Sequence, residues 1–126
     1  MRAWIYHLAG GKPVHLLAED GHYSFAPAPG SETLLRELAA IYLRGQNIAV
    51  HFFPKSSYAY VKTKDEPWRA ARKAWLGSEH GDFARGESDD LYCRLAYKHV
   101  DPLDADFEKL ARQVYEPLRA ALQELP

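Results

Sequence analysis

The chain has 126 residues, of which 47% are hydrophobic and 13% aromatic. This is ample apolar material for one packed core, so the composition excludes an intrinsically disordered chain. No apolar run reaches the roughly 18 residues of a membrane span, and the first residues lack the pattern of a secretory signal peptide. The single cysteine, Cys93, cannot form an internal disulfide, which favours a reducing compartment. We therefore expect a cytoplasmic protein in which residues 1–126 form a single or partial domain.

The charge of the chain is balanced overall but uneven along the sequence. The net charge is -1, which neither favours nor excludes a nucleic-acid partner. Residues 55–73 hold six Lys or Arg and two acidic residues, whereas residues 79–90 hold five acidic residues and one Arg. Neighbouring blocks of opposite sign can pair with each other or face different partners.

The first third of the chain predicts a hairpin. Residues 2–9 are interpreted as a short helix or strand that ends at Gly10-Gly11. Two short β-type runs, 14–17 and 23–25, flank Asp20-Gly21, a dipeptide typical of a hairpin turn.

A helix is predicted from Ser31, a suitable N-terminal cap, to Gly45, a C-terminal stop. Its apolar side chains recur with the spacing of one buried stripe and are Leu34, Leu35, Leu38, Ile41 and Tyr42. The apolar run 48–53 predicts a buried strand that ends at Pro54. Residues 56–61 fit either the start of a helix or a strand.

A second helix is predicted over residues 68–76, with Pro67 in its first turn and Gly77 as its stop. One face carries its apolar side chains, and the opposite face carries its cations, Arg69, Arg72 and Lys73. Residues 77–90 are predicted to form a surface loop.

The last third of the chain predicts two more helices. Asp89 or Asp90 is expected to cap a short helix that runs to Tyr97. Asp101 is expected to cap a long terminal helix with Pro102 in its first turn and a kink at Pro117, which lacks a backbone donor. The elements together predict an α/β (α+β) fold with a small mixed sheet flanked by helices.

The sequence contains no complete catalytic or metal-binding set. No acidic residue is followed two positions later by Lys or Arg, as the Mg²⁺ nucleases require. One cysteine excludes a zinc site built on cysteine pairs, and the six histidines show no His-x-x-x-His spacing. Gly11-Lys12 lacks the first glycine and the hydroxyl residue of a phosphate-binding loop. We therefore expect no active site, metal or cofactor in this chain.

Residues 52–64 combine aromatic rings with lysines and hydroxyls. This chemistry suits single-stranded DNA, because bases stack on rings and cations neutralise phosphates. Spacing alone favours the simpler interpretation that the rings are core residues and the lysines a solvated face. The candidate DNA contacts are Lys55, Ser56, Tyr58, Tyr60, Lys62, Lys64, Arg72 and Lys73.

Four ordered segments, read together, resemble one family. They are Phe52-Phe53-Pro54-Lys55-Ser56-Ser57-Tyr58-Ala59-Tyr60, Ala71-Arg72-Lys73-Ala74-Trp75, Arg85-Gly86-Glu87-Ser88-Asp89-Asp90 with Tyr92, Arg94 and Leu95, and Asp101-Pro102-Leu103 with Phe107. They look like the C-terminal end of the RecC family, the gamma subunits of exodeoxyribonuclease V, the RecBCD helicase-nuclease. The opening residues 2–8 and the hairpin also match the order of the family, and the resemblance spans nearly the whole chain. One departure is Leu91, where the family more commonly has proline.

The resemblance implies a fold and a set of partners. The fold would be part of an inactive restriction-endonuclease-like (PD-(D/E)xK) nuclease domain. The partners would be RecB-like and RecD-like subunits and DNA, single-stranded or at a fork, with ATP and Mg²⁺ used by the partner subunits. RecC-type subunits split the duplex, guide single strands and help recognise the Chi sequence in double-strand-break repair and homologous recombination.

Three functional hypotheses follow. The first is a non-catalytic, DNA-contacting and subunit-binding segment of exodeoxyribonuclease V. The second is a purely structural protein-interaction domain without DNA contact. The third is an active nuclease, which the missing acidic motif disfavours. Pairing of the basic residues 55–73 with the acidic residues 79–90 would favour the second hypothesis, and an open basic groove would favour the first.

Overall fold

The computed structural model describes residues 13–18, 21–26, 30–77 and 85–125. These residues form two compact units, one from residues 1–48 with 117–126 and one from residues 49–116. The predicted element over residues 2–9 lies outside the described residues. In the described part of the chain, helices and a small sheet give the mixed α/β fold that the sequence predicts.

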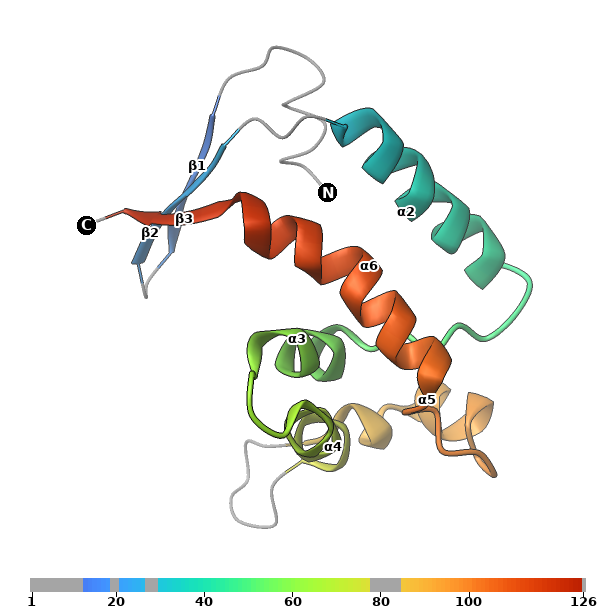
Figure 1. Ribbon diagram of the computed structural model, residues 1–126. Helices are drawn as coiled ribbons and strands as arrows, with labels where there is room; N and C mark the ends of the chain where they lie inside the picture. The colour runs from blue at the N-terminus through green and yellow to red at the C-terminus, as the bar shows by residue number, and fades with distance from the viewer. Residues whose placement is uncertain (1–12, 19–20, 27–29, 78–84, 126) are drawn as a thin grey trace. The chain divides into compact units, whose positions relative to one another are not determined.

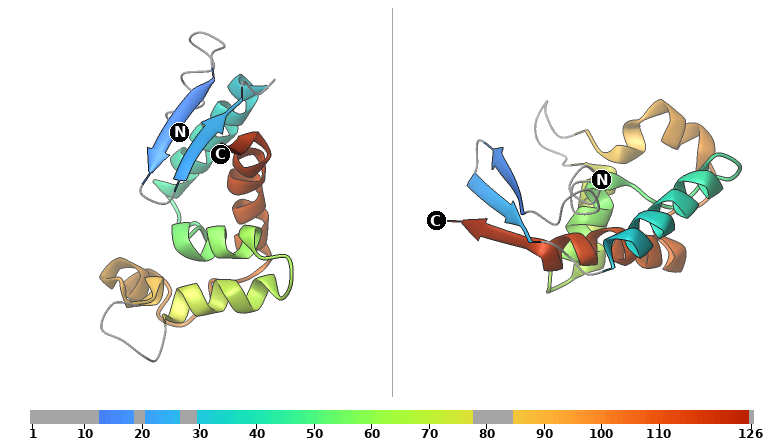
Figure 2. Two further views of the ribbon diagram at one scale, coloured as in Figure 1. Left: turned by 90° about the vertical axis from the view of Figure 1, so that its left-hand side faces the viewer. Right: turned by 90° about the horizontal axis from the view of Figure 1, so that it is seen from above.

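The first unit contains a three-stranded antiparallel sheet in the order β1-β2-β3 (Figures 1 and 2). Its strands are β1 (Val14–Ala18), β2 (Gly21–Phe25) and β3 (Leu122–Leu125). Val14 pairs with Phe25 and Ala18 with Gly21, which confirms the predicted hairpin. Phe25 pairs in turn with Leu122, so the third strand comes from the last residues of the chain. The sequence did not predict β3, because its first residue continues the apolar spacing of the preceding helix.

Helix α2 (Ser31–Gly45) follows the hairpin and ends at the predicted glycine. The predicted cap at Ser31 is wrong. Gly30 occupies the cap position with φ of 85°, a left-handed conformation that glycine adopts without strain, and Ser31 is a buried residue inside the helix. The predicted apolar stripe is half-buried rather than buried, and Tyr42 at its end is 64% exposed.

The second unit packs short helices around an aromatic core. Its helices are α3 (Pro54–Lys62), α4 (Pro67–Leu76), the 3₁₀ turn η1 (Glu87–Asp89), α5 (Leu91–Ala96) and the first turns of α6 (Ala105–Ala121). Helices α3 and α4 lie side by side (Figures 1 and 2). The buried residues of this core are Phe53, Tyr60, Ala71, Trp75, Leu103, Phe107 and Ala111.

Rings rather than aliphatic chains fill most of this core. The ring centroids of Phe53 and Trp75 lie 4.4 Å apart, and those of Tyr60 and Phe107 lie 5.8 Å apart in an edge-on arrangement. Tilted and edge-on aromatic pairs contribute about 0.5–1.5 kcal/mol each beyond the area that they bury. Phe107 is completely buried and contacts rings from α3 and α4, so it joins α6 to both helices.

The predicted strand over residues 48–53 does not form. This segment has no regular structure, and the N–H of Phe52 donates to the carbonyl of Val50 at 2.8 Å. Its apolar character reflects entry into the core at Phe53 rather than pairing in a sheet. The open alternative for residues 56–61 resolves as a helix, with Pro54 in its first turn.

Of the caps predicted for the last two helices, one is confirmed and one is wrong. The Asp90 carboxylate accepts the N–H groups of Tyr92 and Cys93 and caps α5, as predicted. Asp101 does not cap α6. The helix begins three residues later, where Asp104 accepts the N–H of Phe107 at 3.0 Å. Both aspartates have capping chemistry, and local sequence alone does not separate them.

Replacement of Phe107 by alanine tests the aromatic core. The change empties a fully buried ring site, so we expect a loss of about 3–5 kcal/mol in the free energy of unfolding, measured by urea denaturation. Leu95→Ala is the control, because its side chain is 68% exposed and should change stability by less than about 0.5 kcal/mol. Similar losses in the two variants would contradict the described core.

Candidate nucleic-acid interface

The carboxylate of Glu87 closes the N-terminus of α3. Its Oε1 atom accepts the N–H of Lys55 at 2.8 Å, and its Oε2 atom accepts both the N–H and the hydroxyl of Ser56 at 2.7 and 2.6 Å. The first N–H groups of a helix have no partner within the helix, and the helix dipole favours a negative charge there. Hydrogen bonds to an ionised group contribute roughly 1.5–3 kcal/mol each. This helix end, an ordinary site for a phosphate, is therefore already occupied by a side chain of the protein.

Gly86 places Glu87 at this position. A Cβ atom on Gly86 would collide with the backbone of Trp75, Leu76 and Gly77 at the end of α4. The neighbouring residue Arg85 forms an antiparallel bridge with Gly77. Because only glycine allows the two backbones to approach this closely, the chain enters η1 against α4 and directs Glu87 towards α3.

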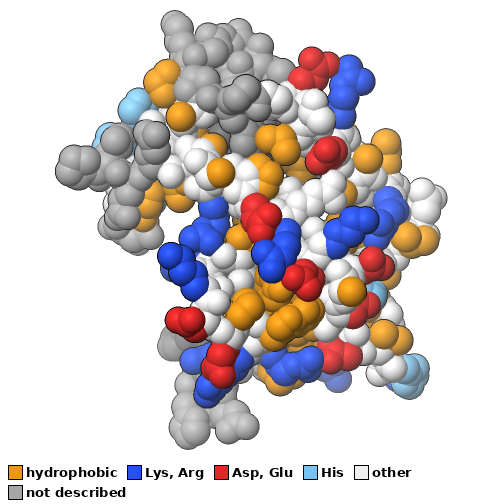
Figure 3. Space-filling model, viewed as in Figure 1, with side chains coloured by type: hydrophobic (Ala, Val, Ile, Leu, Met, Phe, Trp, Pro, Cys, Tyr) orange, Lys and Arg blue, Asp and Glu red, His pale blue; other side chains and the backbone are white. Residues whose placement is uncertain are grey.

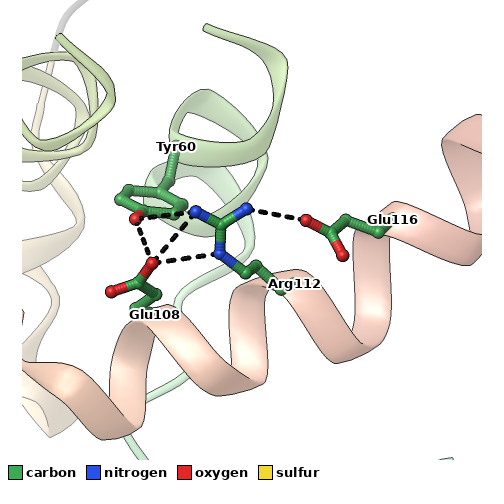
Figure 4. A network of polar contacts seen from close by, with 4 residues as sticks. All are labelled: Tyr60, Glu108, Arg112 and Glu116. Atoms are coloured by element: carbon green, nitrogen blue, oxygen red, sulfur yellow. Dashed lines mark hydrogen bonds and ion pairs between the residues drawn. The ribbon is translucent and has the colours of Figure 1, made fainter. Parts of the chain in front are cut away.

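A second polar network joins α3 to α6 (Figure 4). The hydroxyl of Tyr60 donates to Glu108 at 2.7 Å, and Arg112 contacts both Glu108 and Glu116 at 3.0 and 2.8 Å. The Arg112 guanidinium also lies 5.3 Å from the centre of the Tyr60 ring. Hydrogen bonds from Tyr60 and then Arg112 lower the pKa of the Glu108 carboxyl. Tyr60 is thus held inside the unit at both its ring and its hydroxyl.

Tyr58 and Lys62 lie together on the exposed side of α3. The Nζ atom of Lys62 is 5.7 Å from the centre of the Tyr58 ring, and this ring is held edge-on by Tyr115 at 5.6 Å. Tyr58 is 41% exposed. An exposed ring beside an ammonium group is the arrangement that can stack a base and neutralise its phosphate.

The cations of α4 differ from one another in their partners. Arg72 donates to the Asp101 carboxylate at 2.6 Å, and this hydrogen bond is the main cause of the lowered pKa of Asp101. Arg69 pairs with Glu66 at 2.9 Å. Lys73 is exposed and makes no ion pair with another described residue.

The eight predicted contacts therefore separate by burial. Ser56 and Tyr60 point inward, with exposed fractions of 0% and 3%, and are bonded to Glu87 and Glu108. Arg72 is exposed but paired. The remaining five are exposed and are Lys55, Tyr58, Lys62, Lys64 and Lys73. Within the described part of the chain, the four lysines among them form no ion pair.

The acidic block does not neutralise these lysines through its described residues. Glu87 binds the backbone and one hydroxyl of α3, not a lysine side chain. On the face drawn in Figure 3, Lys and Arg side chains are interspersed with Asp and Glu, and hydrophobic side chains show between them. DNA contact on such a surface would depend on individual lysines rather than on one broad field of positive charge.

The described residues contain no group of three or more His, Cys, Asp or Glu side chains arranged to hold a metal ion. In the same residues, every helix is too short or too polar to serve as a membrane span.

The fold and this surface define a small α/β protein with exposed lysines on the helix α3. The carboxylate of Glu87, from elsewhere in the same chain, closes the N-terminus of this helix. The family model of the RecC C-terminal domain matches residues 1–65, just over half of the chain. The chain therefore belongs to the RecC C-terminal domain family, which makes it part of the RecBCD complex of DNA recombination and repair. No curated protein matches the chain.

The matched residues include the hairpin, α2 and α3, and with them the lysines at positions 55, 62 and 64. The motifs in α4, η1 and the start of α6 lie beyond the match, so the resemblance there stays a prediction. Sequence reasoning missed the roles of Gly86 and Glu87. Glu87 bonds to residues 31 and 32 positions away, a separation that no local pattern reveals.

Loss of the Glu87 carboxylate should loosen the start of α3. Glu87→Ala leaves three donors without their acceptor, one of them the buried hydroxyl of Ser56, and we expect stability to fall by about 3 kcal/mol in urea denaturation. Asp89→Ala, in the same turn, removes an exposed carboxylate without a partner among the described residues and should change stability by less than about 0.5 kcal/mol. Equal effects would show that Glu87 is only a surface charge.

The lowered pKa values of Asp101 and Glu108 predict a fold that weakens in acid. Both carboxyls bind protons more weakly in the folded chain than in the unfolded chain, so falling pH favours unfolding. Their contribution is complete above the ordinary carboxyl pKa of about 4 and is lost as the pH falls below it. Urea midpoints measured across this range should decrease, and the decrease should be smaller in the double variant Asp101→Asn with Glu108→Gln. An unchanged pH dependence in this variant would contradict the assignment.

Proposed function

We propose that this chain is a non-catalytic, DNA-contacting and subunit-binding segment of exodeoxyribonuclease V, acting in double-strand-break repair and homologous recombination. Its membership in the RecC C-terminal domain family carries the proposal. The partners are RecB-like and RecD-like subunits in the cytoplasm, which supply the ATP-driven and Mg²⁺-dependent chemistry. The DNA is single-stranded or at a fork.

The proposed DNA contacts are the exposed members of the predicted set. Lys62 is the last residue of α3 and Lys64 lies two residues beyond it, and Tyr58 lies beside Lys62. A lysine that forms no ion pair loses little on binding a phosphate, because no protein carboxylate has to be displaced first. This supports contact through Lys62 and Lys64 rather than through Arg72, which already has the Asp101 carboxylate as a partner.

Ser56 and Tyr60 are left out of the proposed contact surface. Both are buried and bonded to carboxylates, so phosphate contact at Ser56 or base stacking on Tyr60 would require part of the unit to open. Tyr58 remains as the aromatic contact in the segment 52–64.

Removal of the two lysines at the end of α3 tests the DNA contact. Lys62→Ala with Lys64→Ala should weaken binding to a fluorescent oligothymidylate and lower the slope of log affinity against log salt by about 1.4, or about 0.7 for each lost phosphate contact. Lys109→Ala removes an exposed lysine of α6 and is the matched control. Salt-independent binding, or an equal effect of the control, would contradict the proposal.

A second candidate function, a structural interaction domain without DNA contact, is supported by the outer side of α5. Leu91, Tyr92 and Leu95 are 64%, 79% and 68% exposed on this six-residue helix. Adjacent exposed apolar side chains are typical of protein–protein contacts. The same surface would serve subunit binding in the first candidate, so DNA binding is the property that separates the two.

Charges placed on α5 should weaken assembly. Leu91→Asp with Leu95→Asp is expected to reduce co-purification with RecB-like and RecD-like subunits while leaving the chain folded, because both side chains are already in water. Leu76→Asp, at a leucine of α4 that is 60% exposed, is the matched control. Undiminished co-purification of the α5 variant would show that α5 is not a subunit contact.

A further inference from the structure

A cleft of about 450 Å³ lies in the second unit, apart from the lysines of α3. Residues of α4, α5 and the turn before α6 line it. Its volume falls in the range of roughly 300–1,000 Å³ that is usual for small-ligand sites. Both cations and aromatic rings line the cleft.

The cations that line the cleft are Arg72, Arg94 and Lys98. Asp101, which also lines the cleft, accepts a hydrogen bond from Arg72 and neutralises it. Arg94 and Lys98 are exposed and four residues apart, and the side chain of neither forms an ion pair or hydrogen bond with another described residue. The cleft therefore keeps two cations free for an anionic ligand.

The aromatic residues that line the cleft are Trp75 and Tyr97, whose ring centroids lie 6.4 Å apart at a steep angle. The Tyr97 hydroxyl donates to the carbonyl of Val50 at 2.8 Å, and its ring packs edge-on against Phe53 at 5.3 Å. Both rings are thus held in place without a ligand. A preformed wall saves the ordering cost that a mobile wall would add to binding.

We propose that this cleft binds one nucleotide of a single DNA strand, with the phosphate between Arg94 and Lys98 and the base or sugar against Tyr97, which the buried Trp75 ring supports from behind. The inference rests on the proposed function and adds a second contact site to it. A nucleotide joins a ring to a phosphate, which matches the half-buried Tyr97 ring beside two free cations. An acidic polypeptide supplies negative charges but carries no ring in each of its residues. It would therefore match the cations of the cleft and leave the Tyr97 ring without a partner.

Cys93 gives a readout inside the cleft, because it lines the cleft and is the single cysteine of the chain. Burial, and then the charges of Asp90 and Glu87, raise the pKa of its thiol, so alkylation by iodoacetamide is best followed in mildly alkaline buffer. Saturating oligothymidylate is expected to slow alkylation of Cys93 several-fold. The same protection is expected in Lys62→Ala with Lys64→Ala once the oligonucleotide is again saturating.

Charge reversal of the two free cations tests the site directly. Arg94→Glu with Lys98→Glu should weaken oligonucleotide binding about tenfold or more and abolish the protection of Cys93. The exchange Arg94→Lys with Lys98→Arg keeps both charges and should keep the protection. Far-ultraviolet circular dichroism should be unchanged in both variants, because the two side chains are exposed.

The outcomes separate this inference from the proposed function. Oligonucleotide binding that leaves the alkylation rate of Cys93 unchanged would overturn the cleft as a DNA site while DNA contact through α3 stands. Protection by polyglutamate equal to that by oligothymidylate would assign the cleft to an acidic polypeptide and overturn the nucleotide inference. No binding of oligothymidylate by the unaltered chain would overturn both.

Discussion

The second unit depends on one carboxylate placed at the beginning of one helix. Glu87 satisfies two backbone N–H groups and a buried hydroxyl of α3, and Gly86 allows the chain that carries it to lie against the end of α4. This contact makes the start of α3 part of a closed structure instead of an open anion site. The Glu87 carboxylate binds the backbone and one hydroxyl of α3 rather than a lysine side chain, so it leaves the charge of the described lysines available to a partner.

The aromatic core explains why the rings of the segment 52–64 have different roles. Phe53 and Tyr60 enter the core, where Tyr60 is also fixed by Glu108 and Arg112, while Tyr58 stays at the surface beside Lys62. One helix face thus supplies core rings and the other supplies an exposed ring with a cation. The interpretation of the rings as core residues therefore holds for Phe53 and Tyr60, and the proposed DNA contact is confined to the exposed part of the segment.

Sequence patterns predicted the elements that depend on nearby residues. The hairpin, the glycine stop of α4 at Gly77 and the Asp90 cap all follow from local turn and capping chemistry. The run at 48–53 was mistaken for a strand, because an apolar segment that enters a core has the same composition as a buried strand. The exposure of Lys73 follows from helical periodicity. The burial of Ser56 and Tyr60 does not, because it depends on partners 31 and 48 positions away.

The pairing of β3 with β2 has a consequence for how the chain is made. The hairpin is synthesised before the strand that covers the free edge of β2, because β3 follows β2 in the sequence only after α2 to α6. Until then, the N–H and C=O groups on that edge have no strand partner, and such edges favour pairing with other chains. Because contacts between distant parts of a sequence form slowly, the sheet passes through a period of aggregation risk during synthesis. The helical second unit, in contrast, is complete in sequence before the sheet can close.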